Sequence, residues 1–265
     1  MLRQEIKRGS TKNSFWITVV VMVIFSCIYV LKQPVYSSEE FLDVYIKGGS
    51  LTAYDSFIFF NLSKSANILI LILPLLSSLV YSDTYLEDKK SGFLKFIYMR
   101  SEKKKYLRTK FLANFIVSGL AVAIPIMISF IFLRLRIPSG EPNPILGVNT
   151  IFPTQLFPKL FYSHPNIYIL LWIVIYFIYA GAFSSLGLSL SIFIKNRIAV
   201  LFSPFIICHV IGIALEFLGG YKYYPLNFLY LSLYKSFTVI ILEFIVLMFV
   251  SYLVFVIGGK KRECI

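Results

Sequence analysis

The sequence predicts an all-α integral membrane protein with six membrane-spanning helices, and three observations lead to that prediction. Hydrophobic residues make up 58% of the 265 residues and charged residues only 15%, whereas a soluble domain is about 45–50% apolar and about 25% charged. Mean hydropathy is +0.77. The apolar residues gather in six segments, each long enough to cross most or all of a hydrocarbon core about 30 Å thick. We expect a single transmembrane domain over residues 1–265, with spans at 14–31, 66–81, 111–133, 167–194, 198–218 and 237–257.

The first span follows a short amphipathic segment. Leu2 and Ile6 are four residues apart among Arg3, Lys7 and Arg8, which favours a helix lying on the membrane surface; a frayed basic tail is the alternative. The apolar part of the first span is longer than the hydrophobic region of a signal peptide, which is about 7–15 residues. No small-residue cleavage pattern follows it, so we interpret it as an uncleaved span.

Lysine and arginine are unequally divided between the two sides of the spans. With the N-terminus inside, the inner segments hold 18 of the 26 basic residues and the outer segments 8. Cytoplasmic loops carry such an excess, so we expect both termini and the loop 82–110 in the cytoplasm. The same rule accounts for the net charge of +13, and we therefore expect a lipid bilayer and no nucleic acid as partner. The expected location is the cell membrane, most simply a bacterial cytoplasmic membrane.

The segments expected outside differ in character. Residues 32–65 form a mixed polar loop, and residues 134–166 contain six of the eleven prolines. Proline removes a backbone donor and fixes φ, so the second loop should be extended or rich in turns and not helical. Residues 219–236 begin with two glycines and hold five tyrosines. Tyrosine prefers the membrane interface, so this stretch should lie in the outer interface or dip into it and return.

The loop 82–110 is the one long charged run, with nine basic residues against four acids. Asp83 and Glu87 are four residues apart, so a helix that continues from the second span would place them on one face. We expect Gly92 to break the helix, because glycine tolerates backbone conformations that end helices. A short apolar patch beside Lys95 and Arg100 then consists of Phe93, Leu94, Phe96, Ile97 and Tyr98. This pattern is typical of a short amphipathic helix on the inner surface, and equally of a basic loop touching lipid headgroups.

Around these residues the chain resembles the permease subunits of ABC-2-type (type V) ABC transporters. The family pattern has two acids four apart at the end of the second span, a glycine about five residues later, and a lysine opening the third span. Asp83, Glu87, Gly92 and Lys110 stand at those positions. The six spans, the N-terminal cytoplasmic helix and the re-entrant segment between the last two spans are similar too. The chain departs from the pattern at Phe93, where a threonine is common, and at residues 99–101, where a proline is common.

The resemblance implies the permease subunit of an ATP-driven exporter that docks on a separate ABC ATPase dimer. Two permease copies, or this chain with a related one, would enclose the path. No GxxxxGK[ST] motif occurs, so we expect ATP and Mg²⁺ to be bound by the partner, with no cofactor, metal or catalytic residue here. The implied substrates are a bacteriocin-like or other antimicrobial peptide, a drug or a lipid-linked molecule. We assign ATPase coupling to Asp83, Glu87, Asp88, Gly92, Phe93 and Lys95.

Three polar residues within spans are candidates for a substrate pathway: Glu216, Glu243 and His209. A charge in the middle of a lone helix costs about 2.5–3.5 kcal/mol, so each acid should face protein or water, or be protonated. Structural hydrogen bonding or snorkelling is the alternative for the acids, and a satisfied buried histidine for His209. Gly181 and Ser185 are small residues four apart that allow close helix packing. They would serve either packing within the chain or an interface between two permeases.

Two other function classes remain open from the sequence. A membrane enzyme, such as an intramembrane protease, needs a nucleophile with a base, or a set of metal ligands. The chain has two histidines and no GxSxG motif. Its three cysteines have no spacing typical of a metal site or disulfide framework. A non-enzymatic immunity or assembly protein of the membrane is the second alternative.

Overall fold

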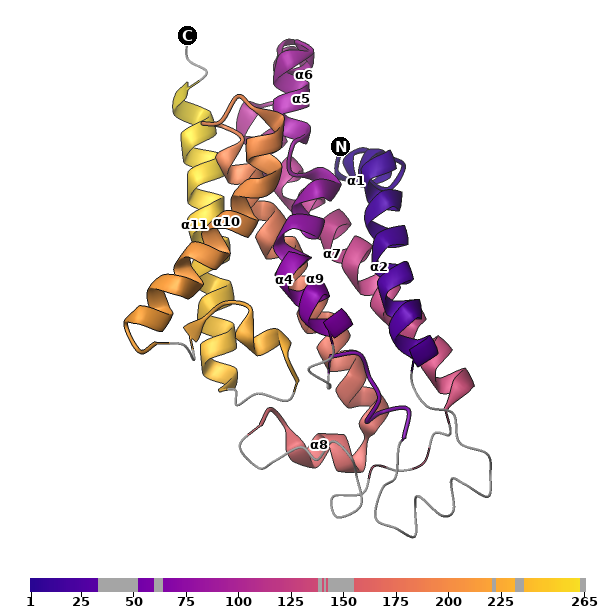
Figure 1. Ribbon diagram of the computed structural model, residues 1–265. Helices are drawn as coiled ribbons and strands as arrows, with labels where there is room; N and C mark the ends of the chain where they lie inside the picture. The colour runs from indigo at the N-terminus through magenta and orange to yellow at the C-terminus, as the bar shows by residue number, and fades with distance from the viewer. Residues whose placement is uncertain are drawn as a thin grey trace.

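The computed structural model describes residues 1–32, 52–59, 64–137, 140, 142, 155–220, 223–231 and 236–262. Within these ranges the secondary structure is helical and contains no strand. Six of the helices are long and apolar enough to cross a membrane, which agrees with the prediction, and they form one bundle (Figure 1). They are α2 (Asn13–Lys32), α4 (Lys64–Tyr81), α7 (Lys103–Arg136), α9 (Pro165–Leu190), α10 (Arg197–Phe217) and α11 (Phe237–Arg262).

Helices α7 and α9 form the centre of the bundle. The apolar part of α9 is 67% buried, against 22% for that of α11, and α9 packs on α4, α7, α10 and α11. The backbones of α7 and α9 approach closely at two glycines: a Cβ on Gly119 would lie 2.7 Å from Phe177, and one on Gly181 would lie 2.6 Å from Phe115. Ser185 lies in the same contact, 3.5 Å from Asn114. Gly181 and Ser185 therefore pack within the chain, as small residues in membrane helices often do.

Three short helices and the start of α7 lie together at one end of the bundle, where the chain begins (Figure 1). They are α1 (Leu2–Ser10), α5 (Thr84–Lys90) and α6 (Phe93–Arg100). Gly92 separates α5 from α6 with a left-handed φ of 72°, so the predicted break is present. We call the end formed by α1, α5, α6 and residues 103–110 the basic end.

Helix α7 begins eight residues before the predicted span at 111–133, because the basic run 103–110 is itself helical. Lysine, arginine and leucine lose little side-chain freedom in a helix, so the run can continue the helix outward. A helix of 34 residues is about 51 Å long, whereas the hydrocarbon core is about 30 Å thick. Helix α7 is therefore longer than the hydrocarbon core is thick.

At the opposite end of the bundle, residues 52–59 are buried, although the sequence predicted a polar loop over 32–65. The ring of Phe59 stacks on Tyr176 at 4.3 Å between centroids. Thr52 Oγ1 donates a hydrogen bond of 2.8 Å to Asp55 Oδ2, and the Asp55 amide donates one of 3.2 Å to Thr52 Oγ1. The Asp55 carboxylate can be buried because Thr52 donates hydrogen bonds to it, and most other residues of the segment are apolar. The Ser56 hydroxyl is buried without a partner among the described residues.

Two further segments concern the loops that the sequence predicted on the outer side of the membrane. Of the stretch 219–236, residues 219–220, 223–231 and 236 are described. Residues 223–231 contain the short helix η2 (Asn227–Leu229) and bury Leu226, Leu229 and Leu231. The amide of Leu231 donates 3.1 Å to the carbonyl of Phe59, so this stretch folds back onto the bundle. The proline-rich loop 134–166 was predicted to lack helix, yet it contains α8 (Pro158–Ser163). That prediction was wrong there because proline at the first position of a helix costs no hydrogen bond.

Candidate functional site

The main polar feature of the structure is an ion cluster at the basic end, centred on Lys110. The Lys110 side chain is fully buried, and its Nζ lies 2.8 Å from Glu5 Oε2 and 2.7 Å from Asp88 Oδ2. Tyr81 donates a hydrogen bond to Glu5, and Tyr106 donates one of 2.6 Å to Asp88. One ammonium group thus bridges carboxylates from α1 and α5.

Arg8 completes this cluster from the side of α1. Its Nη1 lies 2.7 Å from Asp88 Oδ1, the oxygen that Lys110 leaves free. Burial alone would lower the pKa of Arg8, but the hydrogen bond and the charge of Asp88 outweigh it and raise that pKa from its ordinary value. Asp88 therefore receives a charge-assisted bond on each oxygen, which is the arrangement that a buried carboxylate requires.

A second group of ion pairs joins the start of α5 to two other elements. Lys12, in the turn between α1 and α2, lies 2.8 Å from Asp83 and 3.0 Å from Glu87. Arg197, the first residue of α10, lies 2.6 Å from Asp83 and 3.3 Å from Glu87. Asp83 and Glu87 thus share a face, as their spacing predicted. That face contacts Lys12 and Arg197 of the same chain. We refer to the two groups together as the ion network.

The structure places the six predicted coupling residues in two different environments. Asp83 and Asp88 are buried and Glu87 is about one-third exposed, and all three are engaged within the chain. Gly92 forms the turn that reverses the chain. Phe93 and Lys95 lie on α6 and are exposed. The surface that a partner could reach is therefore formed by α6, while the acids of α5 hold α5 in place.

Helix α6 has one face anchored and one face open. Leu94 is buried, and the ring of Tyr98 packs edge-on against Tyr106 at 6.0 Å. On the open face Phe93 is 47%, Phe96 62% and Met99 73% exposed. These three are spaced three residues apart, so they line one side of the helix. Large apolar side chains this exposed beyond the spans are typical of an interaction surface.

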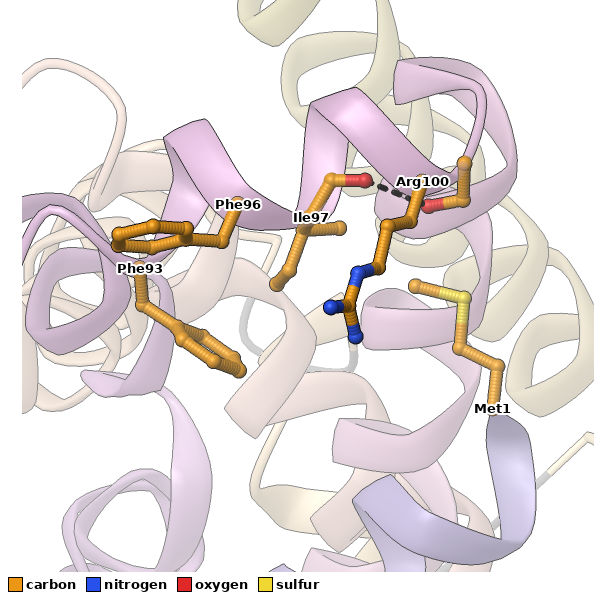
Figure 2. Close-up of a pocket in the computed structure, with 6 residues that line it drawn as sticks. Met1, Phe93, Phe96, Ile97 and Arg100 are labelled. Atoms are coloured by element: carbon orange, nitrogen blue, oxygen red, sulfur yellow. Dashed lines mark hydrogen bonds between the residues drawn. The ribbon is translucent and has the colours of Figure 1, made fainter.

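A groove borders this open face. One hollow of about 490 Å³ is lined by Met1, Phe93, Phe96, Ile97, Arg100 and Ser101, as Figure 2 shows. A neighbouring hollow of about 490 Å³ shares Phe93 and Phe96 and reaches Gln4 and Arg8 on α1. The two hollows lie on either side of the same rings, and we call them together the α1–α6 groove.

Sequence reasoning missed half of the ion network: Glu5, Arg8, Lys12 and Arg197 were not assigned to any site. Their partners are 71 to 105 residues away for the first three, so no local spacing points to the pairs. One signal was present: Glu5 is the single acid in an otherwise basic N-terminal segment. The basic residues of this segment suit contact with anionic lipid, whereas an acid does not. Glu5 was therefore a candidate for a buried ion pair.

The predicted substrate-pathway residues do not converge. His209 Nδ1 lies 2.8 Å from the Phe205 carbonyl, one turn earlier on α10. Glu216 is exposed near the end of the same helix. Glu243 on α11 is half-buried beside Tyr179, and its Oε2 has no hydrogen-bond partner among the described residues. No described hydrogen bond or ion pair joins the three, and the described residues contain no cluster of metal-ligating side chains.

Comparison with known proteins gives a distant relative. No family model matches the chain. It is 28% identical over 134 residues to a Bacillus subtilis (strain 168) protein called "Uncharacterized protein YybM". The aligned part covers 50% of this chain and 53% of that protein, so the chain spans about half the length of this relative. The relative's name assigns it no activity.

Proposed function

We propose that this chain is the permease subunit of an ATP-driven exporter, and that a separate ATPase docks on α6. The observation that carries the proposal is the construction of α6: an exposed apolar and basic helix mounted on a segment that ion pairs fasten to three other elements. The basic end would face the cytoplasm, where ATP is available. The permease role and the docking of an ATPase on α6 both go beyond the six-helix architecture and are proposals.

The mounting of α6 suits the transmission of force. Asp83 and Glu87 tie α5 to α10 through Arg197, and Asp88 ties it to α1 and α7 through Arg8 and Lys110. A push on α6 would therefore reach several membrane helices at once and would not be absorbed by a flexible loop. Closely packed elements of this kind move as rigid bodies. A loop that served only to neutralise lipid headgroups would need no such fastening.

The proposed work of the ATPase is to move the membrane helices around a substrate path. We expect the path at an interface between two permease chains, with a peptide, a drug or a lipid-linked molecule as cargo. Glu216, Glu243 and His209 belong to the two helices at the edge of the bundle, α10 and α11. Polar side chains inside membrane helices are costly, so a path that gives them water or cargo to contact is consistent with their presence.

The first experiment tests the partnership. If a reading frame with Walker motifs lies beside the gene of this chain, the chain is produced together with that adjoining ATPase, purified in detergent and reconstituted in vesicles. We expect the ATPase to co-purify and its hydrolysis rate to rise several-fold over that of ATPase alone. Because this chain lacks a P-loop, the complex formed with an ATPase variant whose Walker lysine is changed to alanine provides the background rate.

The second experiment tests the sidedness on which the proposal depends. A cysteine introduced at Lys95 should react with a membrane-impermeant maleimide only after the cells are opened, in a background with the native cysteines replaced by serine. Labelling of intact cells at this position would refute the proposal. So would a reconstituted chain that neither retains nor stimulates the adjoining ATPase.

A further inference from the structure

The α1–α6 groove suggests which features the docking partner must present. We propose that this groove receives an apolar side chain of the ATPase, flanked on the ATPase by acidic residues, so that α1 is part of the docking surface. The inference rests on the proposed function and adds two statements about the docking surface. One is a concave contact beside the protruding α6, and the other is the chemistry of the matching surface.

The shape of the groove fits a side chain. Each hollow has a volume of about 490 Å³, within the range of about 300–1,000 Å³ typical of pockets that hold small molecules. The first hollow has an apolar lining of Met1, Ile97 and the rings of Phe93 and Phe96 (Figure 2). The second hollow is lined by the same two rings and otherwise by polar side chains. Buried aromatic and aliphatic anchors in such pockets carry most of the binding energy at protein interfaces.

The charge around the groove selects an acidic surface. Three of the four acids in residues 82–110 are already paired within the ion network. Lys89, Lys90, Lys95 and Arg100 are exposed and form no ion pair with any described residue. Arg100 lines the groove, and the three lysines lie on α5 and α6 outside its lining. Glu5 and Asp88 border one hollow, but Lys110 and Arg8 neutralise them. The accessible surface is therefore positive, and a partner with carboxylates beside its apolar anchor would match it.

A protein segment suits this groove better than a lipid chain does. Helix α6 packs beside Tyr106, in the first turn of α7, and that turn belongs to the basic run 103–110 ahead of the apolar part of the helix. Ser101 Oγ donates a hydrogen bond of 3.1 Å to the Ile97 carbonyl. Figure 2 shows the Met1 side chain, at the start of α1, reaching toward Arg100 of α6. An acyl chain would have to leave the membrane to reach it.

The experiment fills the groove in the full chain and measures binding of the adjoining ATPase, purified separately. Gln4→Trp places a large ring in the hollow next to α1, and we expect the apparent Kd to rise at least tenfold. Lys7→Trp is the matched control, because Lys7 is exposed on α1 and lines neither hollow. It should stay within twofold of the wild type.

Charge is tested at two neighbouring positions with opposite expected signs. Arg100→Glu should raise the apparent Kd about tenfold. Glu102→Lys adds a positive charge two residues further on, where the acid is exposed and forms no described ion pair, and it should leave the Kd unchanged or lower it. A Kd that both changes raise equally would overturn the acidic-partner inference.

A photo-crosslinking amino acid at Gln4 gives a second readout if Gln4→Trp fails to fold. We expect an adduct with the ATPase from Gln4 and from Phe96, and none from Lys7. An ATPase that crosslinks at Phe96 but not at Gln4, and that Gln4→Trp does not weaken, would overturn the groove while leaving α6 docking intact. A lipid adduct at Gln4 would overturn it as well. If the wild-type chain retains no ATPase at all, the proposed function and this inference fail together.

Discussion

Nζ of Lys110 lies 2.7 Å from Oδ2 of Asp88, and the two side chains are 0% and 1% exposed. The pair joins α7 to α5 in a place where water cannot screen either charge. Lys110 also binds a second carboxylate, because its Nζ lies 2.8 Å from Glu5 Oε2 of α1. One ammonium group therefore joins α1, α5 and α7, beside the separate ion pair of Arg8 with Asp88.

Removing that ammonium group should be severely destabilising. In Lys110→Met the Glu5 and Asp88 carboxylates lose a shared cation, and breaking a buried pair from one side costs about 3–5 kcal/mol. We expect a loss of that size in the free energy of unfolding, measured by titration with a denaturing detergent. Lys104→Met, on the exposed side of the same helix, should change it by less than about 0.5 kcal/mol. Equal effects of the two changes would show that the cluster contributes nothing.

The contact between α5 and α10 should be weaker, because it is partly in water. Arg197 is 54% exposed, and exposed ion pairs contribute about 0–1 kcal/mol. Arg197→Met leaves Asp83 with Lys12 alone, so we expect a loss of about 1 kcal/mol of unfolding free energy. Lys195→Met, two residues earlier and exposed, is the control and should have no measurable effect. A loss as large as that of Lys110→Met would contradict this ranking.

A methyl group at Gly181 should disrupt the packing of α7 on α9. Its Cβ would lie 2.7 Å from the backbone oxygen of Phe115, and a backbone atom can move only if the helix moves. We expect Gly181→Ala to lower the unfolding free energy by about 1–3 kcal/mol, the usual cost of overpacking. At Gly258 the nearest atom to an added Cβ is 3.5 Å away, so Gly258→Ala should be tolerated. Tolerance of both changes would mean that α7 and α9 are not in close contact.

Asp55 should make stability depend on pH at the end opposite the ion network. Burial raises its pKa from 3.8 to about 6, against the effect of the Thr52 hydrogen bonds. The fold therefore favours the protonated acid. Its contribution is fully present below about pH 4 and is lost as the pH rises through about 6, a change of about 2–3 kcal/mol.

The Asp55→Asn variant isolates this contribution. We expect its stability relative to the wild type to rise between pH 4 and pH 7 and then to level off, measured as the shift in thermal unfolding midpoint across that range. The other titrating groups are common to both proteins and cancel in the difference. A difference that does not vary with pH would show that the pKa of Asp55 is the same in the folded and the unfolded protein.

The six spans could be predicted because each is a property of its own segment. An apolar run of about 20 residues must bury its backbone polar groups in a helix wherever it meets lipid, so composition alone was sufficient. The break at Gly92 and the shared face of Asp83 and Glu87 were predictable for the same local reason. The burial of residues 52–59 was not, because it depends on a helix more than 100 residues later, where Tyr176 stacks on Phe59.

The sequence by itself determined that the chain is helical, membrane-spanning and carries an amphipathic charged segment between its second and third spans. Only the tertiary structure decided which of that segment's charges are available. Asp83, Glu87 and Asp88 meet Lys12, Arg8, Lys110 and Arg197 across the fold, and no pattern along the chain encodes those distances. Burial makes an unpaired charge so costly that the acids were bound to find cations, but which cations they found depended on how the helices pack.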